Sequence, residues 1–160
     1  VLPFMISMGM HKALVPYAVA SISDPGFEML YMPASLAHNI SEGGACLGVA
    51  LKTKDENLRA TAISAGISGL FGITEPALYG VNLPLKRPML GIMAGTAVGG
   101  IIAGVLGATA YVYGYSTILA LPIFQQTMWA MAIAIVAAIV VSALVTAALG
   151  FEDRPVKAQK

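Results

Sequence analysis

The sequence predicts an all-α membrane protein in which transmembrane helices stand beside two interrupted, re-entrant segments. Three observations predict this fold class. Hydrophobic residues make up 58% of the 160 residues and charged residues only 11%, whereas soluble domains contain about 25% charged residues. Apolar stretches in the C-terminal half are long enough to cross a bilayer, which takes about 20 residues. Two other apolar stretches contain Gly, Pro and ionisable residues, which a plain span does not tolerate.

Composition and charge also exclude several classes of function. A net charge of +1 provides no basic surface for binding phosphates, so a nucleic-acid partner is not expected. The single cysteine, Cys46, cannot form a disulfide within the chain. Its small neighbours at 43–48 favour a buried helix contact over a reactive thiol. Because the chain begins at Val1 with no basic stretch before its apolar start, we interpret it as a fragment of a longer polypeptide.

The first segment, residues 1–22, is apolar but interrupted. His11 and Lys12 stand five and four residues before Pro16, a combination that predicts a broken or re-entrant helix. His11 has two interpretations that the residues alone leave open. It is either a structural hydrogen-bonding group, or a group that contacts a sugar hydroxyl and assists proton movement near neutral pH.

The second segment, residues 33–51, is polar for a membrane span, so we expect much of it to face protein or water. His38 and Glu42 are four residues apart and therefore share a helix face. Two ligands alone are a weak signal for a metal site. We predict a polar helix contact here, no metal site and no cofactor.

The third segment, residues 60–85, contains Glu75 between helix-interrupting glycines and prolines. A charged loop at 52–59 precedes it and the basic pair Lys86 and Arg87 follows it. Each half of the segment is too short to cross, and the positive-inside rule assigns both ends to the cytoplasm. A segment that enters and leaves on the same side is a re-entrant hairpin, with Glu75 at its tip.

Two uninterrupted spans complete the membrane part. Residues 89–110 contain glycines at four-residue spacing, which favours close helix packing, and three tyrosines at 111–115 suggest an aromatic belt at the outer interface. After a short apolar stretch at 116–124, residues 127–149 form the cleanest span. We expect residues 1–150 to form the C-terminal, substrate-binding part of a larger membrane domain and residues 151–160 a cytoplasmic tail or linker.

Glu75 is the first candidate for chemistry. A carboxylate at the bilayer midplane costs roughly 3 kcal/mol on insertion scales, so something must repay this cost. Thr74 can cap the second half-helix, whose positive end favours an ionised carboxylate. An ionised carboxylate only accepts hydrogen bonds, so Glu75 can bind two sugar hydroxyls. The alternative is a structural ion pair with Lys12 or another basic group that only holds helices together.

Three further residues near Glu75 are candidates for the same site. Asn82 offers an amide that can donate to and accept from hydroxyls. Tyr79 and Phe71 can stack on a sugar ring, although core packing is the commoner role for each. No Walker-type phosphate loop and no Ser-His-Asp or Cys-His arrangement is readable in the sequence. The chain therefore has no evident nucleophile.

These motifs resemble a known family. The run from Gly72 to Val81 (GITEPALYGV) resembles the signature of the enzyme IIC membrane component of the bacterial phosphoenolpyruvate-dependent phosphotransferase system, in its glucose superfamily. The stretch from Met8 to Pro16 (MGMHKALVP) resembles that family's histidine segment. Residues Gly43–Asp55 are similar to the span and basic loop that precede the signature in this family, so the resemblance covers nearly the whole chain. Tyr79–Pro88 is similar to the β-glucoside branch.

The resemblance implies a fold and a function. Enzyme IIC binds sugar between two opposed re-entrant hairpins in a multi-pass protein of the bacterial inner membrane. The motif glutamate, here Glu75, holds sugar hydroxyls, and the histidine, here His11, lies near the reacting hydroxyl. These two residues are the expected catalytic positioning groups. With Thr74 and Asn82 they form the expected substrate-binding set.

The implied partners are a sugar, most simply a β-glucoside, and the phosphocarrier domains IIB and IIA. A phosphocysteine of IIB phosphorylates the sugar at its 6-hydroxyl, so Cys46 is not that cysteine. The resemblance further implies membrane lipid around the protein and a homodimer of the full-length form. The alternative function is an ion-coupled secondary sugar transporter, which also uses broken helices and a midplane carboxylate but leaves the sugar unmodified.

Overall fold

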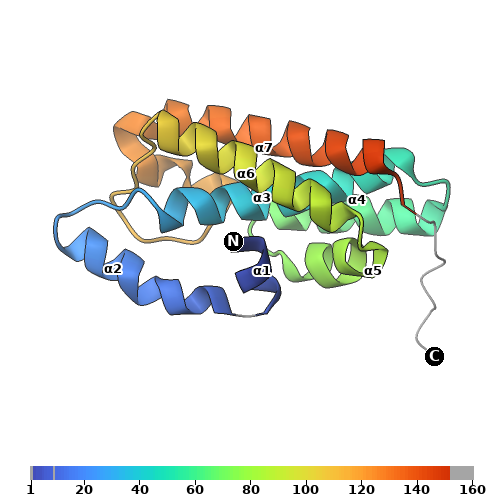
Figure 1. Cartoon of the computed structure of the whole chain (residues 1–160), viewed down its shortest axis with the longest axis horizontal. Coiled ribbons are helices and arrows are strands. Elements are labelled where there is room, and N and C mark those ends of the chain that lie inside the picture. Colours follow the sequence, from blue (N-terminus) through green and yellow to red (C-terminus); the bar gives the residue numbers. More distant parts are fainter. Residues whose placement is uncertain (1, 9, 152–160) are drawn as a thin grey trace.

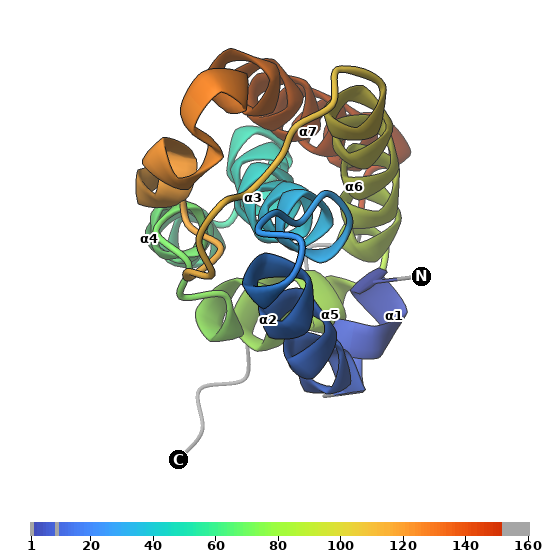
Figure 2. The same ribbon diagram turned by 90° about the vertical axis from the view of Figure 1, so that its left-hand side faces the viewer.

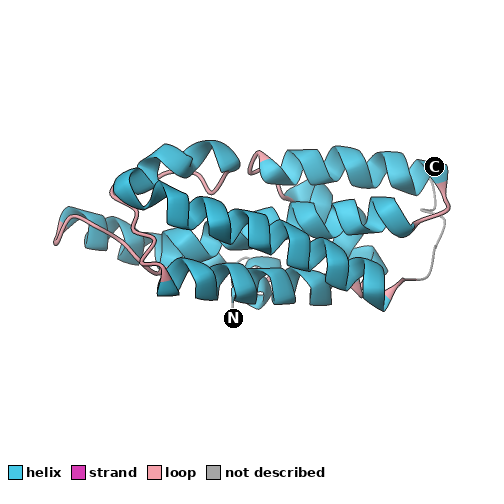
Figure 3. Cartoon of the chain, turned by 90° about the horizontal axis from the view of Figure 1, so that it is seen from above, coloured by secondary structure: helices cyan, strands magenta, loops and turns pink. Residues whose placement is uncertain are grey.

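All regular structure in the described part of the chain is helical. The computed structural model describes residues 2–8 and 10–151 (Figure 1). In chain order the elements are α1 (Leu2–Ser7), η1 (Met10–Leu14), α2 (Val15–Ser23), α3 (Tyr31–Lys52), α4 (Glu56–Leu70), η2 (Pro76–Asn82), α5 (Leu83–Leu85), α6 (Pro88–Val105), η3 (Ile118–Thr127) and α7 (Met128–Leu149). Within the described residues no strand is present beyond an isolated antiparallel bridge between Glu28 and Ala110 (Figure 3). The predicted all-α class is confirmed.

Within the residues that the structure describes, two helical stretches are long and apolar enough to cross a membrane. They are Pro88–Val105, which is α6, and Ile118–Leu149, which joins η3 to α7. The predicted uninterrupted spans, 89–110 and 127–149, correspond to these stretches. The sequence and the helices agree on an all-α membrane protein.

The long helices α3, α6 and α7 lie side by side along the length of the molecule (Figure 1). Seen from one end, α3 is central, with α6 and α7 on one side and α2 and α5 on the other (Figure 2). Close approach depends on small residues, as the four-residue glycine spacing predicted. At Gly95 a Cβ would stand 2.7 Å from the Ala138 carbonyl oxygen and 2.8 Å from Ser41 Oγ. Nothing larger than hydrogen fits there.

Helix α3 buries its polar residues against protein, as predicted for this polar segment. Ser41, His38 and Glu42 are all at most 1% exposed. The helix begins at Tyr31 because the Glu28 carboxylate accepts hydrogen bonds from the N–H groups of the first turn, including that of Met32 at 2.8 Å. The structure buries Glu28 to 1% exposure as a cap.

Helix α4 begins earlier than predicted. The charged stretch 52–59 was expected to be a loop, but the helix begins at Glu56. The reason is local, because the Asp55 side chain accepts hydrogen bonds from the N–H groups of Asn57 (2.8 Å) and Leu58 (3.3 Å). These bonds satisfy donors that a helix start otherwise leaves free.

Both predicted interruptions are present. The first apolar segment divides into α1, η1 and α2, and the third divides into α4 and η2 at residues 71–75. Neither is a single continuous helix. Of the predicted tail, only Phe151 is described, and residues 152–160 lie outside the described part of the chain.

Candidate functional site

A cavity of about 840 Å³ lies where the two interrupted segments meet α3. This volume is within the usual range of small-molecule sites. Its walls come from four parts of the chain: η1 and α2, the N-terminal half of α3, the break before η2, and the loop that follows α6. The lining residues are His11, Lys12, Val15, Pro16, Tyr31, Ser35, Asn39, Gly72, Thr74, Glu75, Leu78, Tyr79, Tyr113, Gly114, Tyr115 and Ser116.

The turn before Glu75 is built by the end of α4. Gly72 has φ of +89°, and the N–H groups of Gly72 and Ile73 donate to the carbonyls of Gly69 and Ser68, each at 3.0 Å. This is the Schellman arrangement, in which glycine takes the left-handed position. A Cβ on Gly72 would also stand 3.2 Å from Thr117 Cβ. The turn therefore ends α4 and directs the chain back along it.

Glu75 stands immediately before η2 and is exposed in the cavity. No ion pair joins it to Lys12 among the described residues, although both line the cavity. The structural pairing that the sequence left open is therefore not formed. The carboxylate keeps its acceptor capacity for a ligand.

Thr74 lines the cavity but does not cap with its side chain as predicted. Glu75, not Thr74, is the residue that precedes η2, and no side chain caps this helix. Thr74 contributes its carbonyl, which accepts from the N–H of Leu78 at 2.8 Å. Its hydroxyl stays available to the cavity. Residues 76–82 form a π-helical turn, a wide turn that is frequent at functional sites.

His11 and Lys12 line the same cavity from η1. His11 Nδ1 is buried and has no hydrogen-bond partner among the described residues. A buried ring nitrogen without a partner is costly. A ligand hydroxyl is one group that satisfies it.

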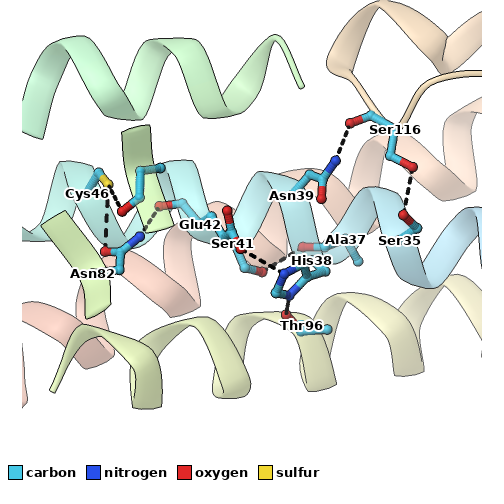
Figure 4. Close-up of polar contacts among 11 residues, drawn as sticks. Ser35, Ala37, His38, Asn39, Ser41, Glu42, Cys46, Asn82, Thr96 and Ser116 are labelled. Carbon is cyan, nitrogen blue, oxygen red and sulfur yellow. Dashed lines mark hydrogen bonds and ion pairs between the residues drawn. The ribbon is translucent and has the colours of Figure 1, made fainter. Parts of the chain in front are cut away.

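Helix α3 contributes Tyr31, Ser35 and Asn39, which are spaced four residues apart and so share one face. Two hydrogen bonds attach the loop after α6 to this face (Figure 4). Asn39 Nδ2 donates to the Ser116 carbonyl at 2.8 Å, and Ser116 Oγ donates to Ser35 Oγ at 2.8 Å. The loop therefore closes one side of the cavity.

The structure does not bring Asn82 to the cavity. Its side chain is 0% exposed, and Nδ2 donates to the Glu42 carbonyl at 3.2 Å (Figure 4). Its Oδ1 accepts from Cys46 Sγ at 3.6 Å. Asn82 thus joins η2 to α3. Cys46 is 0% exposed, which agrees with its predicted place at a tight helix contact.

His38 and Glu42 form a buried pair within α3. His38 Nε2 and Glu42 Oε1 are 2.8 Å apart, and His38 Nδ1 lies 3.4 Å from Thr96 Oγ1 of α6 (Figure 4). The described residues contain no cluster of three or more metal-ligating side chains. The pair is a polar contact within and between helices, as predicted.

Sequence reasoning missed the tyrosines of the loop after α6. Tyr113 and Tyr115 were interpreted as an aromatic belt, but both line the cavity. Tyr79, a stacking candidate from the sequence, lines it too, whereas Phe71 does not. The cavity thus combines one carboxylate, two basic side chains, hydroxyl and amide groups, and aromatic rings. This set suits a polyhydroxylated ligand, and none of the lining residues is a cysteine.

Comparison with known proteins decides the family. The model of the family "Phosphotransferase system, EIIC" matches residues 1–96. The chain belongs to the EIIC family of the phosphotransferase system. The signature around Glu75 and the segment around His11 both lie within the matched residues, so the resemblance noted in the sequence is confirmed.

Relatives of this EIIC chain are named as phosphotransferase components with a stated sugar specificity. The arbutin-, cellobiose-, and salicin-specific EIIBC component of Escherichia coli K12 is 35% identical over 97% of this chain and 33% of its own length. The β-glucoside-specific EIIBCA component of Bacillus subtilis 168 is 36% identical over 94% of this chain and 25% of its own length. These names agree with the branch predicted from Tyr79–Pro88.

A trehalose-specific EIIBC component of Escherichia coli K12 is also similar, at 30% identity over 88% of this chain and 31% of its own length. The chain therefore spans a third or less of the length of these relatives. No solved structure matches the chain.

Proposed function

We propose that this EIIC chain forms the sugar-binding part of a permease that takes up a β-glucoside and has it phosphorylated by a partner IIB domain. The observation that carries the proposal is the single cavity that contains both Glu75 and His11, residues 64 positions apart on two interrupted segments. The names of the relatives supply the substrate class.

Each site residue has a role in this proposal. Glu75 accepts hydrogen bonds from sugar hydroxyls, because its carboxylate has no protein partner in the cavity. His11 contacts the hydroxyl that reacts, and its buried Nδ1 gains a partner from the ligand. Thr74 adds a hydroxyl beside Glu75. Asn82, which is buried outside the cavity, supports the helix that positions Glu75 rather than touching the sugar.

The chemical step belongs to the partner. The sugar 6-hydroxyl oxygen attacks the phosphorus of a IIB phosphocysteine, the P–S bond breaks, and the thiolate takes the hydroxyl proton. Phosphoryl transfer depends mostly on positioning and charge stabilisation. A cavity without a nucleophile is therefore sufficient on this side of the reaction, and His11 and Glu75 act as positioning residues.

The proposal includes an arrangement in the bacterial inner membrane. The two interrupted segments are re-entrant hairpins, α6 and α7 cross the bilayer, and the tail at 151–160 is cytoplasmic. Chain outside these residues supplies the IIB and IIA domains and the contacts of a homodimer. The greater length of the relatives supports this.

The test is Glu75→Gln in the complete permease that contains this chain. Loss of a hydrogen-bonding charge costs about 10- to 100-fold in binding, so phosphorylation of a β-glucoside should fall by that factor. Glu56→Gln is the matched control, because Glu56 is an exposed carboxylate outside the cavity. Normal phosphorylation by the Glu75→Gln variant would contradict the proposal.

An uptake assay with the complete permease distinguishes the proposed function from the alternative, an ion-coupled transporter. An ion-coupled transporter accumulates unmodified sugar and responds to a collapsed proton gradient. The proposed permease accumulates only sugar phosphate and requires phosphoenolpyruvate. Chromatography of the accumulated product distinguishes the two.

A further inference from the structure

The proposed reaction brings a strongly charged group into this cavity. A phosphate monoester has a charge of about −2 at neutral pH, and Glu75 is the single carboxylate among the lining residues. Two negative groups in one site repel each other. Phosphoryl transfer is promoted mainly by positioning and by stabilising charge on the phosphoryl oxygens. The reaction therefore needs a cation in the cavity wall.

Lys12 is the cation that the cavity offers. Of the lysines and arginines in the described part of the chain, it alone lines the cavity. Its side chain is exposed, and no described carboxylate lies within ion-pair distance of its ammonium. The ammonium can therefore bind an anion without first giving up a protein carboxylate.

Lys12 stands beside the residue assigned to the reacting hydroxyl. It directly follows His11 in η1, and both residues line the cavity. Neighbouring residues of a 3-10 helix point about 120° apart, so the two side chains contact a ligand from different directions. The flexible four-carbon stem of lysine then lets the ammonium reach a phosphoryl oxygen on the hydroxyl that His11 contacts.

The ordinary role of an exposed lysine in a membrane protein is to extend its ammonium to water. Two observations favour a ligand instead. The neighbouring His11 has a buried Nδ1 with no partner among the described residues, so this part of the wall is incomplete without a ligand. Lys12 also faces a cavity that contains a carboxylate, Glu75, and does not pair with it.

We propose that Lys12 is the phosphoryl-binding residue of this site. Its ammonium donates a hydrogen bond to a phosphoryl oxygen while the bond from the sugar 6-hydroxyl oxygen to phosphorus forms and the P–S bond to the IIB cysteine breaks. The thiolate takes the hydroxyl proton, and Lys12 stays protonated and contributes only charge. Lysine binds phosphate well in this way, as a point charge. This inference rests on the proposed function, since it assigns the sugar hydroxyls to Glu75 and His11.

The experiment compares two ligands that differ only in the phosphate. Dissociation constants for methyl β-glucoside and methyl β-glucoside 6-phosphate are measured by titration calorimetry on the purified complete permease. Lys12→Gln removes the charge but keeps a hydrogen-bond donor. It should weaken binding of the 6-phosphate about tenfold and binding of the unmodified glucoside less than about threefold. Lys12→Arg, which keeps the charge, should retain the ratio of the two constants.

Turnover provides a second measurement. With phosphorylated IIB as donor, Lys12→Gln should lower kcat about tenfold while KM for methyl β-glucoside changes less than about threefold. Lys52→Gln is the matched control, because Lys52 is an exposed lysine outside the cavity, and both measurements should equal those of the unmodified protein.

Equal weakening of both ligands in Lys12→Gln would overturn the assignment, because Lys12 would then contact only the sugar. Unchanged binding of the 6-phosphate would overturn it too and leave Lys12 as a solvated surface charge. Phosphorylation of methyl β-glucoside by the unmodified protein is measured in parallel. Its absence would contradict the proposed function, whereas the ratio of the two dissociation constants decides the role of Lys12.

Discussion

Charge is distributed sparingly around the cavity. Among the residues that line it, Glu75 is the single acid, and Lys12 is the single lysine or arginine. They do not pair with each other among the described residues. A neutral ligand that is rich in hydroxyls can therefore use the carboxylate as an acceptor and the ammonium as a donor, without first breaking a salt bridge.

The buried His38–Glu42 pair makes a separate prediction about stability. His38→Ala leaves Glu42, which is 0% exposed, without its partner at 2.8 Å. Breaking one side of a buried pair costs about 3–5 kcal/mol, so the variant should denature at a clearly lower temperature in detergent. Glu42→Gln, which removes the charge but keeps an acceptor oxygen for His38, should lose less. Thermal unfolding is followed by size-exclusion chromatography after heating. Equal melting temperatures for His38→Ala and the unmodified protein would contradict this prediction.

Single residues were predicted from the sequence only where local chemistry decides their place. Glu75 and His11 were found because each is ionisable within an interrupted apolar segment. Asn82 was misjudged as a cavity residue, because it ends the π-helical turn 76–82, whose wider spacing changes the face on which its side chain lies. Tyr113 and Tyr115 were not predicted as cavity residues, because their position depends on hydrogen bonds between Ser116 and residues 77 and 81 positions away.

At the scale of elements, the interruptions were the most predictable features. Gly72 supplies the positive φ that ends α4, and Pro76 stands at the start of η2. Both are local signals. The start of α4 was placed too late, because Asp55 caps a helix inside a stretch whose charge suggested a loop.

The packing of α6 against its neighbours predicts a position-dependent effect of adding one methyl group. At Gly95 a Cβ would overlap Ala138 and Ser142, each at 2.7 Å, whereas at Gly100 nothing lies within 4 Å. Gly95→Ala should destabilise the protein by about 1–3 kcal/mol through overpacking. Gly100→Ala on the same helix should be neutral or slightly stabilising, since alanine favours helix. Thermal unfolding of the two purified variants checks the difference, and equal melting temperatures would refute the packing argument.

For the whole molecule, the arrangement in the membrane was inferred from charge and segment length. The fold agrees with the interrupted segments and with the two apolar helical stretches. Sidedness depends on the lipid environment and on the distribution of basic loops, which is why it needs a direct measurement.

Cysteine labelling provides that measurement with little background, because the native Cys46 is buried. Glu56 and Lys86 flank the α4–η2 hairpin and are exposed, as is Asp24 in the loop before α3. Glu56→Cys and Lys86→Cys should both react with an impermeant maleimide in inside-out vesicles, and Asp24→Cys in intact spheroplasts. Labelling of Glu56→Cys and Lys86→Cys from opposite sides would show a crossing segment instead of a hairpin.

The tight contact at Gly95 limits how this molecule can acquire new ligand preferences. A larger side chain at Gly95 would meet Ala138 and Ser142 of α7 and Ser41 of α3, which is two residues from Asn39 in the cavity wall. Tyr113 and Tyr115, in the loop after α6, are under no such restriction, since their side chains are 41% and 91% exposed. Diversification of ligand range among homologues, and libraries designed to redirect uptake toward other glycosides, should therefore succeed mainly by varying this loop while the helices around Gly95 stay unaltered.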